Sequence, residues 1–400
     1  MQAGRRTLLF TLGAAHSLNH SFFVILPPIL PLIVLETGAS MQTVGIMVNI
    51  GYLAYGAGAL VGGSLSDRVG ENRVLTLSIA LSGASTAIIY LFPNLVGLGI
   101  GFFTMSVWAS FYHPTATSLI SKAFPHDTAE ALGIHGAWGS LGIAVFPSAA
   151  VALGVALGWH SAFLFFGAVS IFVSLIFSRF SSYKVSSGRP SQENQPSGGM
   201  GFLEVFRVPG LWVLLLFRLF AGLYFMGIEF ILPTFLIQQR EFSIEMAGVA
   251  VSVLLAFGVL GQLLGGKSAD RIGNKRFLII SSMGALIGLI CIQIIPNSLV
   301  GVVLFIILYG TLTYAHQPAF NSLVASITRT ELRGAIYGLL FFITFGLGSP
   351  SATLAGYLAD TRGPSYVVIA ATLFATVNVV STFFLPRGRE KKLTHPFITH

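Results

Sequence analysis

The sequence predicts an all-α membrane protein with twelve transmembrane helices in two pseudo-symmetric six-helix bundles. Of its 400 residues, 54% are hydrophobic and only 9% are charged, whereas a soluble domain carries about 25% charged residues. Uncharged runs of about 18 or more residues recur along the chain, and each can cross the roughly 30 Å hydrocarbon core as a helix. Continuous apolar runs favour helices over the alternating strands of a barrel. An internal repeat, described below, divides the helices into two sets of six.

The predicted spans follow one another through short connections. The first run, Leu8 to Leu35, is too long for the core of a secretory signal and is predicted to be a permanent helix. The chain has one cysteine, Cys291, so no intrachain disulfide can form. The twelve spans are 8–35, 44–65, 74–92, 95–121, 130–157, 161–179, 209–238, 247–267, 277–296, 298–326, 334–357 and 365–385.

Basic residues are concentrated on one side of the membrane. With an even number of spans both termini lie on that side, and its segments hold nineteen of the 22 Lys and Arg residues. Arg240 and Arg362 fall on the other side, and Arg218 lies within a span. Because Lys and Arg are retained in cytoplasmic loops, we expect a multi-pass protein of a prokaryotic inner (plasma) membrane with both termini cytoplasmic. The net charge of +8 therefore reflects topology and a weak attraction to anionic lipid, and we expect no nucleic-acid partner.

A polar segment separates two related halves. Residues 181–208 are rich in Ser, Gly and Pro without a hydrophobic period, which is typical of a linker. We expect this cytoplasmic linker to join an N-terminal bundle, 1–180, to a C-terminal bundle with a short cytoplasmic tail, 209–400. The halves match at an offset of 203 residues, which pairs segment 62–70 with 265–273, Pro93-Asn94 with Pro296-Asn297, His113 with His316 and Pro147 with Pro350. Duplicated halves of this kind place a solute site at their interface, near the bilayer midplane.

Segment 62–73 resembles the signature loop of the major facilitator superfamily, and the resemblance covers the whole chain. The matching residues are Gly62, Leu65, Asp67, Arg68, Gly70 and Arg73, with Glu71-Asn72 where basic residues are usual. Within that superfamily, segments 15–20, 111–114 and 133–142 resemble fosmidomycin-resistance-type exporters of the drug-proton antiporter branch. The resemblance implies the major facilitator fold and transport by alternating access.

The repeated loops carry candidate gating charges. Asp67 and Asp270 lie at cytoplasmic helix ends, where a carboxylate is stabilised by the positive N-terminus of another helix. The resemblance implies that Asp67 faces helix 11 across the halves and locks the outward-facing state. Arg68, Arg73 and Arg271 would complete this charge network. The alternative is that these are loop charges that only enforce topology.

Helix 7 carries two ionisable candidates for the transport path. Glu229 is the one acidic residue near the middle of a span, where an ionisable group is costly unless it faces the cavity or a partner. It is predicted to couple protons or bind the solute, and the alternative is a structural hydrogen bond to another helix. Arg218 lies eleven residues earlier on nearly the same face, about 16 Å away along the axis. That separation excludes a direct pair, so we expect Arg218 at the cytoplasmic mouth, where it could attract an anion.

Histidines in several spans form a second set of candidates. His16, Asn19 and His20 share one face of helix 1 at i, i+3 and i+4. By the resemblance, helices 1, 4, 7 and 10 line the central cavity, where the repeat mates His113 and His316 would face the solute. Each is closely followed by proline, so the alternative is that the imidazole satisfies a carbonyl that proline frees. Further candidates for the path are His135, Tyr112 and Trp138. No carboxylate or cysteine completes a ligand set at motif spacing, so we expect no metal and no cofactor.

These observations predict a secondary active transporter that moves a small organic solute by alternating access, with proton-coupled efflux by antiport as the leading mechanism. The alternative is a uniporter or importer of a small organic anion, for which Arg218 and the histidines suffice. A membrane-embedded enzyme is disfavoured because no nucleophile constellation or sizeable soluble domain is present. No nucleotide-binding loop is present either, which argues against ATP-driven pumping. We expect the chain to work as a monomer with its solute, protons and membrane lipids as partners.

Overall fold

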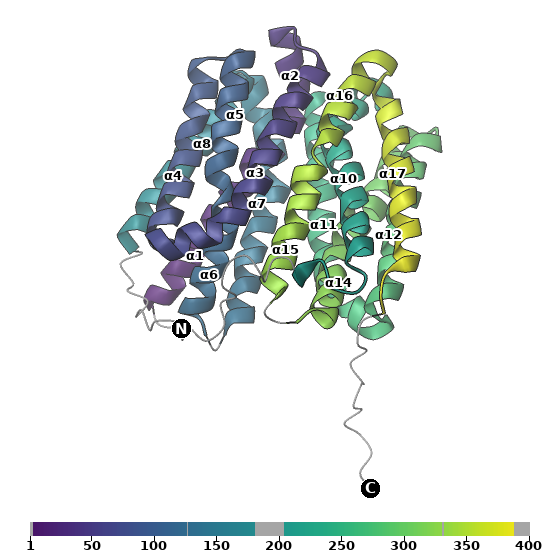
Figure 1. The fold of residues 1–400 in the computed structure, drawn as a ribbon. Coiled ribbons are helices and arrows are strands. Elements are labelled where there is room, and N and C mark those ends of the chain that lie inside the picture. Colours follow the sequence, from purple (N-terminus) through teal and green to yellow (C-terminus); the bar gives the residue numbers. More distant parts are fainter. Residues whose placement is uncertain (1–2, 126, 181–203, 330–331, 388–400) are drawn as a thin grey trace.

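A computed structural model of the chain describes residues 3–125, 127–180, 204–329 and 332–387. Twelve helical segments in these ranges are long and apolar enough to cross a membrane, which confirms the predicted fold class. Figure 1 shows the helices side by side, with the start of α1 and the end of α17 at the same end of the molecule. We call this end the terminal face and the opposite end the far face. The predicted linker up to residue 203, and the tail from residue 388, lie outside the described residues.

The amino-terminal half contains six spans, two of which are broken. Its helices are α1 (Ala3–Val24), α2 (Leu26–Thr37), α3 (Met41–Val69), α4 (Glu71–Leu91), α5 (Leu95–Ser110), α6 (Tyr112–Ala123), α7 (Thr128–Leu157) and α8 (Trp159–Phe180). The first span breaks at Ile25, just before Pro27 and Pro28, and the fourth breaks at Phe111, just before Pro114. Both breaks have one cause, because proline has no N–H and its ring clashes with the carbonyl four residues earlier.

The carboxy-terminal half repeats this arrangement with two π-helical segments. Its helices are α10 (Leu211–Arg240), α11 (Ile244–Ile272), α12 (Asn274–Ile294), α13 (Ser298–Phe305), η2 (Ile306–Gly310), α14 (Thr311–Ile327), α15 (Arg333–Phe341), η4 (Phe342–Leu347), α16 (Pro350–Arg362) and α17 (Pro364–Phe384). Segment η4 lies just before Pro350, which cannot donate to the carbonyl of Gly346. The hydroxyl of Ser349 donates to that carbonyl instead, at 2.7 Å.

The residues that cap and end the helices are repeated between the two halves. Ser40 and Ser243 both cap a helix by accepting from the backbone N–H three residues on, at 3.0 and 3.2 Å. Asn94 and Asn297 do the same, each at 3.0 Å. Gly70 and Gly273 end α3 and α11 with φ of 97° and 89°, a conformation that favours glycine. All three pairs are 203 residues apart, so the two halves share one scaffold.

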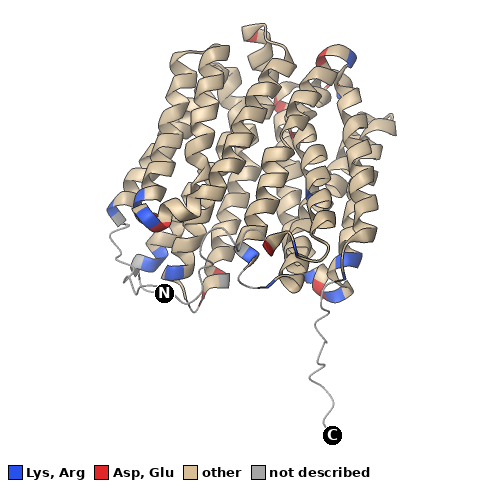
Figure 2. Ribbon diagram, viewed as in Figure 1, with Lys and Arg blue, Asp and Glu red and all other residues tan. Residues whose placement is uncertain are grey.

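The outer surface is apolar between the two faces. Large side chains such as Leu91, Phe172, Leu263 and Phe384 are each more than 60% exposed, which in a soluble protein would be an aggregation hazard and here marks contact with lipid. Figure 2 shows charged residues gathered near the ends of the helices, with most Lys and Arg at the terminal face. The distribution is that of a multi-pass membrane protein.

The two halves approach most closely toward the far face. Helix α3 packs on α16, and α7 packs on α11. A Cβ atom on Gly45 would lie 2.5 Å from the carbonyl oxygen of Ala352, and one on Gly356 would lie 2.4 Å from that of Met41. Small residues allow such backbone approach between membrane helices. The chain is thus closed at its far face.

Candidate functional site

Two adjoining cavities lie between the halves and share Glu229 in their walls. They contain about 310 and 420 Å³ of empty space, including space open to the surroundings. Phe23 and Pro27 from the first span line both cavities, and Tyr52 from α3 lines one of them. From α10, Glu229 faces both cavities and Met226 faces one of them. Their walls therefore come from both halves, as expected for a solute path between two bundles.

Glu229 is a carboxyl group in an otherwise mostly apolar wall. It is half-buried, and the hydroxyl of Tyr314 donates to its Oε1 at 3.2 Å. Within the described ranges it has no basic partner, because the one ion pair there joins Lys122 and Glu71. Pro233 lies four residues on in the same helix, so the backbone carbonyl of Glu229 has no intrahelical donor. Such a carboxyl can take up a proton or contact a cationic group.

Arg218 lies apart from Glu229, as the helical spacing predicts. Its guanidinium carbon is 5.4 Å from the centre of the Phe320 ring, within the range of a cation–π contact. Its Nε atom is buried and makes no hydrogen bond to any described residue. A buried donor without an acceptor is costly, so Arg218 is available to an anion.

Four histidines from three helices meet inside the amino-terminal half. The rings of His16 and His135 stack with centroids 4.1 Å apart, and His113 lies 4.9 Å from His16 and 5.2 Å from His20. Nε2 of His20 is 3.1 Å from Nε2 of His16. These residues come from α1, α6 and α7. The spacing of His16 and His20 on one helix face was predicted, whereas the meeting with His113 and His135 depends on how the helices pack.

Hydrogen bonds fix two of these imidazoles. Nδ1 of His16 donates to the carbonyl oxygen of His135 at 2.8 Å, because a carbonyl can only accept. The hydroxyl of Tyr112 donates to the carbonyl of Leu12 at 2.5 Å, so it must accept from Nε2 of His135 at 3.0 Å. His135 is thereby committed to Tyr112, and Nε2 of His16, which carries no hydrogen, accepts from Nε2 of His20 at 3.1 Å.

Other residues bond to two carbonyls beside the helix break that precedes His113. Asn19 donates to the carbonyl of Ala109 at 3.0 Å, and Ser78 donates to that of Trp108 at 2.7 Å. His113 makes no side-chain hydrogen bond within the described part of the chain. The imidazole of His113 therefore does not bond to a backbone carbonyl of the described residues, as the alternative interpretation had it.

Two other predicted path residues lie elsewhere. His316 stands apart from the histidine cluster, with its ring 5.6 Å from that of Phe217 and a buried Nδ1 that bonds to no described residue. The ring of Trp138 packs over Gly13, and its edge meets Phe10 at 5.9 Å. Trp138 thus joins α7 to α1.

The predicted gating charges lie at the terminal face. Asp67, Arg68, Arg73, Asp270 and Arg271 are all exposed, and none forms an ion pair with a described residue. Asp67 and Asp270 lie in the last turn of their helices, three residues before the glycine that ends each helix.

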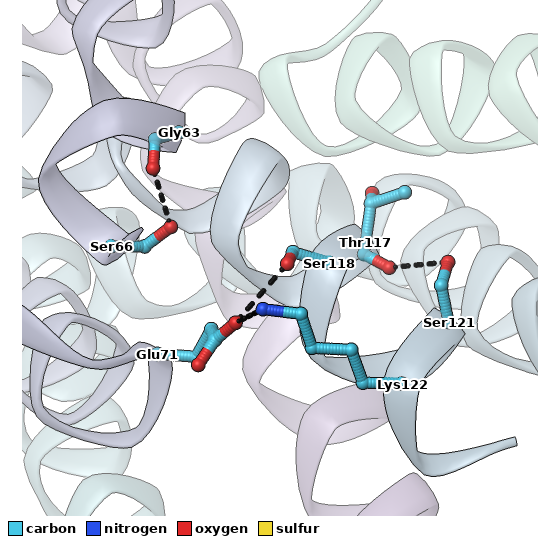
Figure 3. A network of polar contacts seen from close by, with 7 residues as sticks. All are labelled: Gly63, Ser66, Glu71, Thr117, Ser118, Ser121 and Lys122. Carbon is cyan, nitrogen blue, oxygen red and sulfur yellow. Dashed lines mark hydrogen bonds and ion pairs between the residues drawn. The ribbon is translucent and has the colours of Figure 1, made fainter. Parts of the chain in front are cut away.

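Glu71, which replaces the usual basic residue of the loop, has a local role. It accepts from Lys122 in an ion pair and from Ser118 at 3.2 Å, and Figure 3 shows both bonds reaching from α6 to the start of α4. The burial of Glu71 is incomplete, and Lys122 is 40% exposed. The unusual residue therefore ties two helices of one half together.

At the far face a carboxylate joins the halves. Asp360, near the end of α16, accepts from the backbone N–H groups of Met41 at 3.1 Å and Gln42 at 2.9 Å. These are the first two N–H groups of α3, which have no partner inside the helix, and the helix N-terminus favours a negative charge. Sequence reasoning missed Asp360. The signal was present, because Asp360 precedes Gly363 by three residues, as Asp67 precedes Gly70.

Further hydrogen bonds between the halves lie near this contact. Thr353 donates to the carbonyl of Gly45 at 3.3 Å, and Ser148 donates to Ser252 at 2.8 Å. Both bonds join the far-face parts of α3 and α7 to α16 and α11. The hydroxyl of Ser349 lies 2.6 Å from Oδ1 of Asn49 as well as 2.7 Å from the carbonyl of Gly346, and it can donate to only one of them at a time.

Comparison with known proteins agrees with this architecture. The sequence matches the Major Facilitator Superfamily over residues 12–353. It is 24% identical over 389 residues to a protein of Cupriavidus necator named "Probable sulfoacetate transporter SauU", covering 89% of this chain and 88% of that one. It is 23% identical over 363 residues to a "Probable L-galactonate transporter" of Escherichia coli, covering 82% and 77%.

A solved structure has the same fold. A bacterial homologue of the human lysosomal transporter Spinster, in an inward-facing and occupied conformation, aligns with a TM-score of 0.80 at 16% identity and covers 96% of this chain and 97% of that chain. The family and these relatives are transporters, which excludes the enzyme alternative. The chain belongs to the Major Facilitator Superfamily and is a transporter of small organic substrates.

Proposed function

We propose that this chain couples the movement of protons to the export of a small organic solute, with Glu229 as the proton-carrying group. The observation that carries the proposal is the position of Glu229 in the wall of both central cavities without a described basic partner. A carboxyl group there can exchange a proton between the two faces as the halves alternate. The resemblance of segments 15–20 and 111–114 to fosmidomycin-resistance-type exporters favours export as the direction.

We place the terminal face in the cytoplasm of a prokaryotic plasma membrane. The clustering of Lys and Arg at that face supports this orientation, and a relative of C. necator supports a bacterial context. We further propose that bundles 1–180 and 209–400 work as a monomer in lipid. With the far face closed, the described state would then be closed toward the outside.

The experiment uses purified protein in liposomes. Thermal-shift measurements at two pH values select a solute from sulfoacetate, L-galactonate, phosphonates and cationic drugs. Counterflow of that solute is then measured with and without an imposed proton gradient. In the wild type we expect the gradient to stimulate transport, and in Glu229→Gln we expect counterflow to continue without that stimulation. The matched control is Glu36→Gln, which removes an exposed carboxylate at the far face.

Unchanged pH dependence in Glu229→Gln would remove the coupling role. Loss of counterflow together with loss of stimulation would assign Glu229 to solute binding instead.

A second candidate is a uniporter or importer of a small organic anion. Arg218 favours it, since its buried Nε has no described partner, and the names of two relatives refer to organic anions. In this case counterflow of an anion is insensitive to the gradient, and Arg218→Gln weakens it. Gradient-stimulated transport of a cation by the wild type would contradict it.

A further inference from the structure

We propose that His16, His20 and His113 form a binding site for a divalent transition-metal ion of the zinc type. This inference goes beyond proton-coupled transport and stands whether or not Glu229 carries the proton. Neutral imidazole nitrogen is a preferred ligand of Zn²⁺, Ni²⁺ and Co²⁺. A site with three histidines and one open position is a known coordination for zinc.

The first argument is geometric. One ring nitrogen from each of the three histidines lies within 4.8 Å of the other two, and the Nε2 atoms of His16 and His20 are 3.1 Å apart. Ligands of a tetrahedral ion at about 2.0–2.1 Å are about 3.4 Å from one another. The His16–His20 pair is already close to that spacing, and His113 needs to approach by at most about 1.4 Å, the difference between 4.8 Å and about 3.4 Å.

The second argument is the orientation of the ligands. Nδ1 of His16 donates to the carbonyl of His135, which is the outer bond that metal-bound histidines usually make. It leaves Nε2 of His16 as an acceptor, which in the metal-free state takes the hydrogen bond from Nε2 of His20. A bound ion would replace that bond, with the proton of His20 on Nδ1 instead. His113 has no described hydrogen bond that binding would break. The fourth imidazole, His135, is held by Tyr112, which explains why the site has three ligands.

The third argument is access. His20 and His113 are partly exposed, whereas His16 is only 8% exposed. The ring of His113 also lies 6.5 Å from that of Phe341, on α15 of the other half. The partly exposed side of the cluster therefore borders the interface between the halves, where an oxygen of water or of a solute could take the open position.

The test uses the full chain, purified in detergent without a histidine tag. Binding of ZnCl2 is measured by titration calorimetry, and binding of CoCl2 by the visible absorption of four-coordinate Co²⁺. We expect one ion per chain in the wild type. His20→Gln and His113→Gln should each weaken binding by about 10–100-fold or more and abolish the four-coordinate Co²⁺ spectrum. Unfolding temperatures without metal show whether each variant is folded.

Two controls separate this site from other histidines. His316→Gln removes the repeat mate of His113, and the double variant His395→Gln/His400→Gln removes the histidines near the C-terminus. Both should bind one ion as the wild type does. The proposal is overturned if the wild type shows no saturable binding, or if folded His113→Gln and His20→Gln keep wild-type affinity. Loss of binding in the tail variant alone would equally overturn it.

Discussion

The two faces of the molecule differ in how they hold the halves together. At the far face, the carboxylate of Asp360 caps α3, and glycines let α16 touch the backbone of α3. At the terminal face, Asp67 has the same place relative to its helix end, yet it is exposed and has no described ionic partner. A carboxylate three residues before a helix-ending glycine thus bonds to the other half at the far face, whereas at the terminal face it has no described ionic partner. If Asp67 caps a helix of the other half when the far face opens, the two states would exchange one carboxylate cap for the other.

The difference between the faces can be measured by labelling one position. Asn49 lies in the closed far-face contact, where its Oδ1 is 2.6 Å from the hydroxyl oxygen of Ser349. In a Cys291→Ser background, which removes the one native cysteine, Asn49→Cys reports opening of the far face. Its rate of reaction with a membrane-impermeant maleimide is the readout in the first three predictions.

Gly356→Ala should have the largest effect. The added Cβ would lie 2.4 Å from the carbonyl oxygen of Met41, so α16 and α3 must separate. Overpacking of this kind costs about 1–3 kcal/mol, and labelling should rise about 5- to 150-fold. Gly133→Ala is the control, because nothing lies within 4 Å of its Cβ. Equal rates in the two variants would show that backbone contact does not keep the far face closed.

Asp360→Asn should have the next largest effect. It keeps the shape of the side chain but removes the charge at the N-terminus of α3, which is worth about 1 kcal/mol. We expect labelling to rise about 5-fold. Glu36→Gln removes an exposed carboxylate at the same face and should leave the rate unchanged. An Asp360 variant that labels at the wild-type rate would remove the capping role.

Asp67→Asn should act in the opposite direction. If Asp67 caps the eleventh span, residues 334–357, when the far face opens, the loss of its charge disfavours that state by about 1 kcal/mol. Labelling and solute transport should then both slow, with the unfolding temperature unchanged. Asp127→Asn, which removes another exposed charge at the terminal face, is the control. Faster labelling in Asp67→Asn is incompatible with a lock at this position.

Glu71→Gln should have the smallest effect and none on the labelling rate. Its ion pair with Lys122 lies within one half and is partly exposed, so it contributes less than about 1 kcal/mol. A slightly lower unfolding temperature is expected, and the difference from wild type should vanish at about 1 M salt, because exposed charges are screened. A changed labelling rate would mean that Glu71 takes part in gating.

The sequence was informative wherever the signal is local. Apolar runs predicted the twelve spans, and Pro114, next to His113, lies where the fourth span breaks. The approach of His113 to His16 could not be predicted, because it depends on the packing of α6 against α1. The bond from Tyr314 to Glu229 likewise joins residues 85 positions apart. Asp360 was predictable in principle, since its spacing to Gly363 repeats that of Asp67 to Gly70.

The two halves share one scaffold but differ in the ionisable side chains that they place inside it. His113 lies in a cluster of imidazoles, whereas its repeat mate His316 lies against Phe217. Glu229 and Arg218 occur in the carboxy-terminal half, where each has a separate environment. A proton and a metal ion would thus be held by different halves, and each can be tested by variants that leave the other half intact.

The backbone contacts at Gly45 and Gly356 have a kinetic consequence. At both crossings the helices meet through main-chain atoms, so they can part without a side chain leaving a slot on the opposite helix. Separation there breaks the hydrogen bonds that Asp360 accepts from α3 and that Thr353 donates to Gly45, but it withdraws no bulky side chain from the opposite helix. We therefore expect a low energy barrier to separation of these helices, which suits rigid-body motion on the microsecond to millisecond scale.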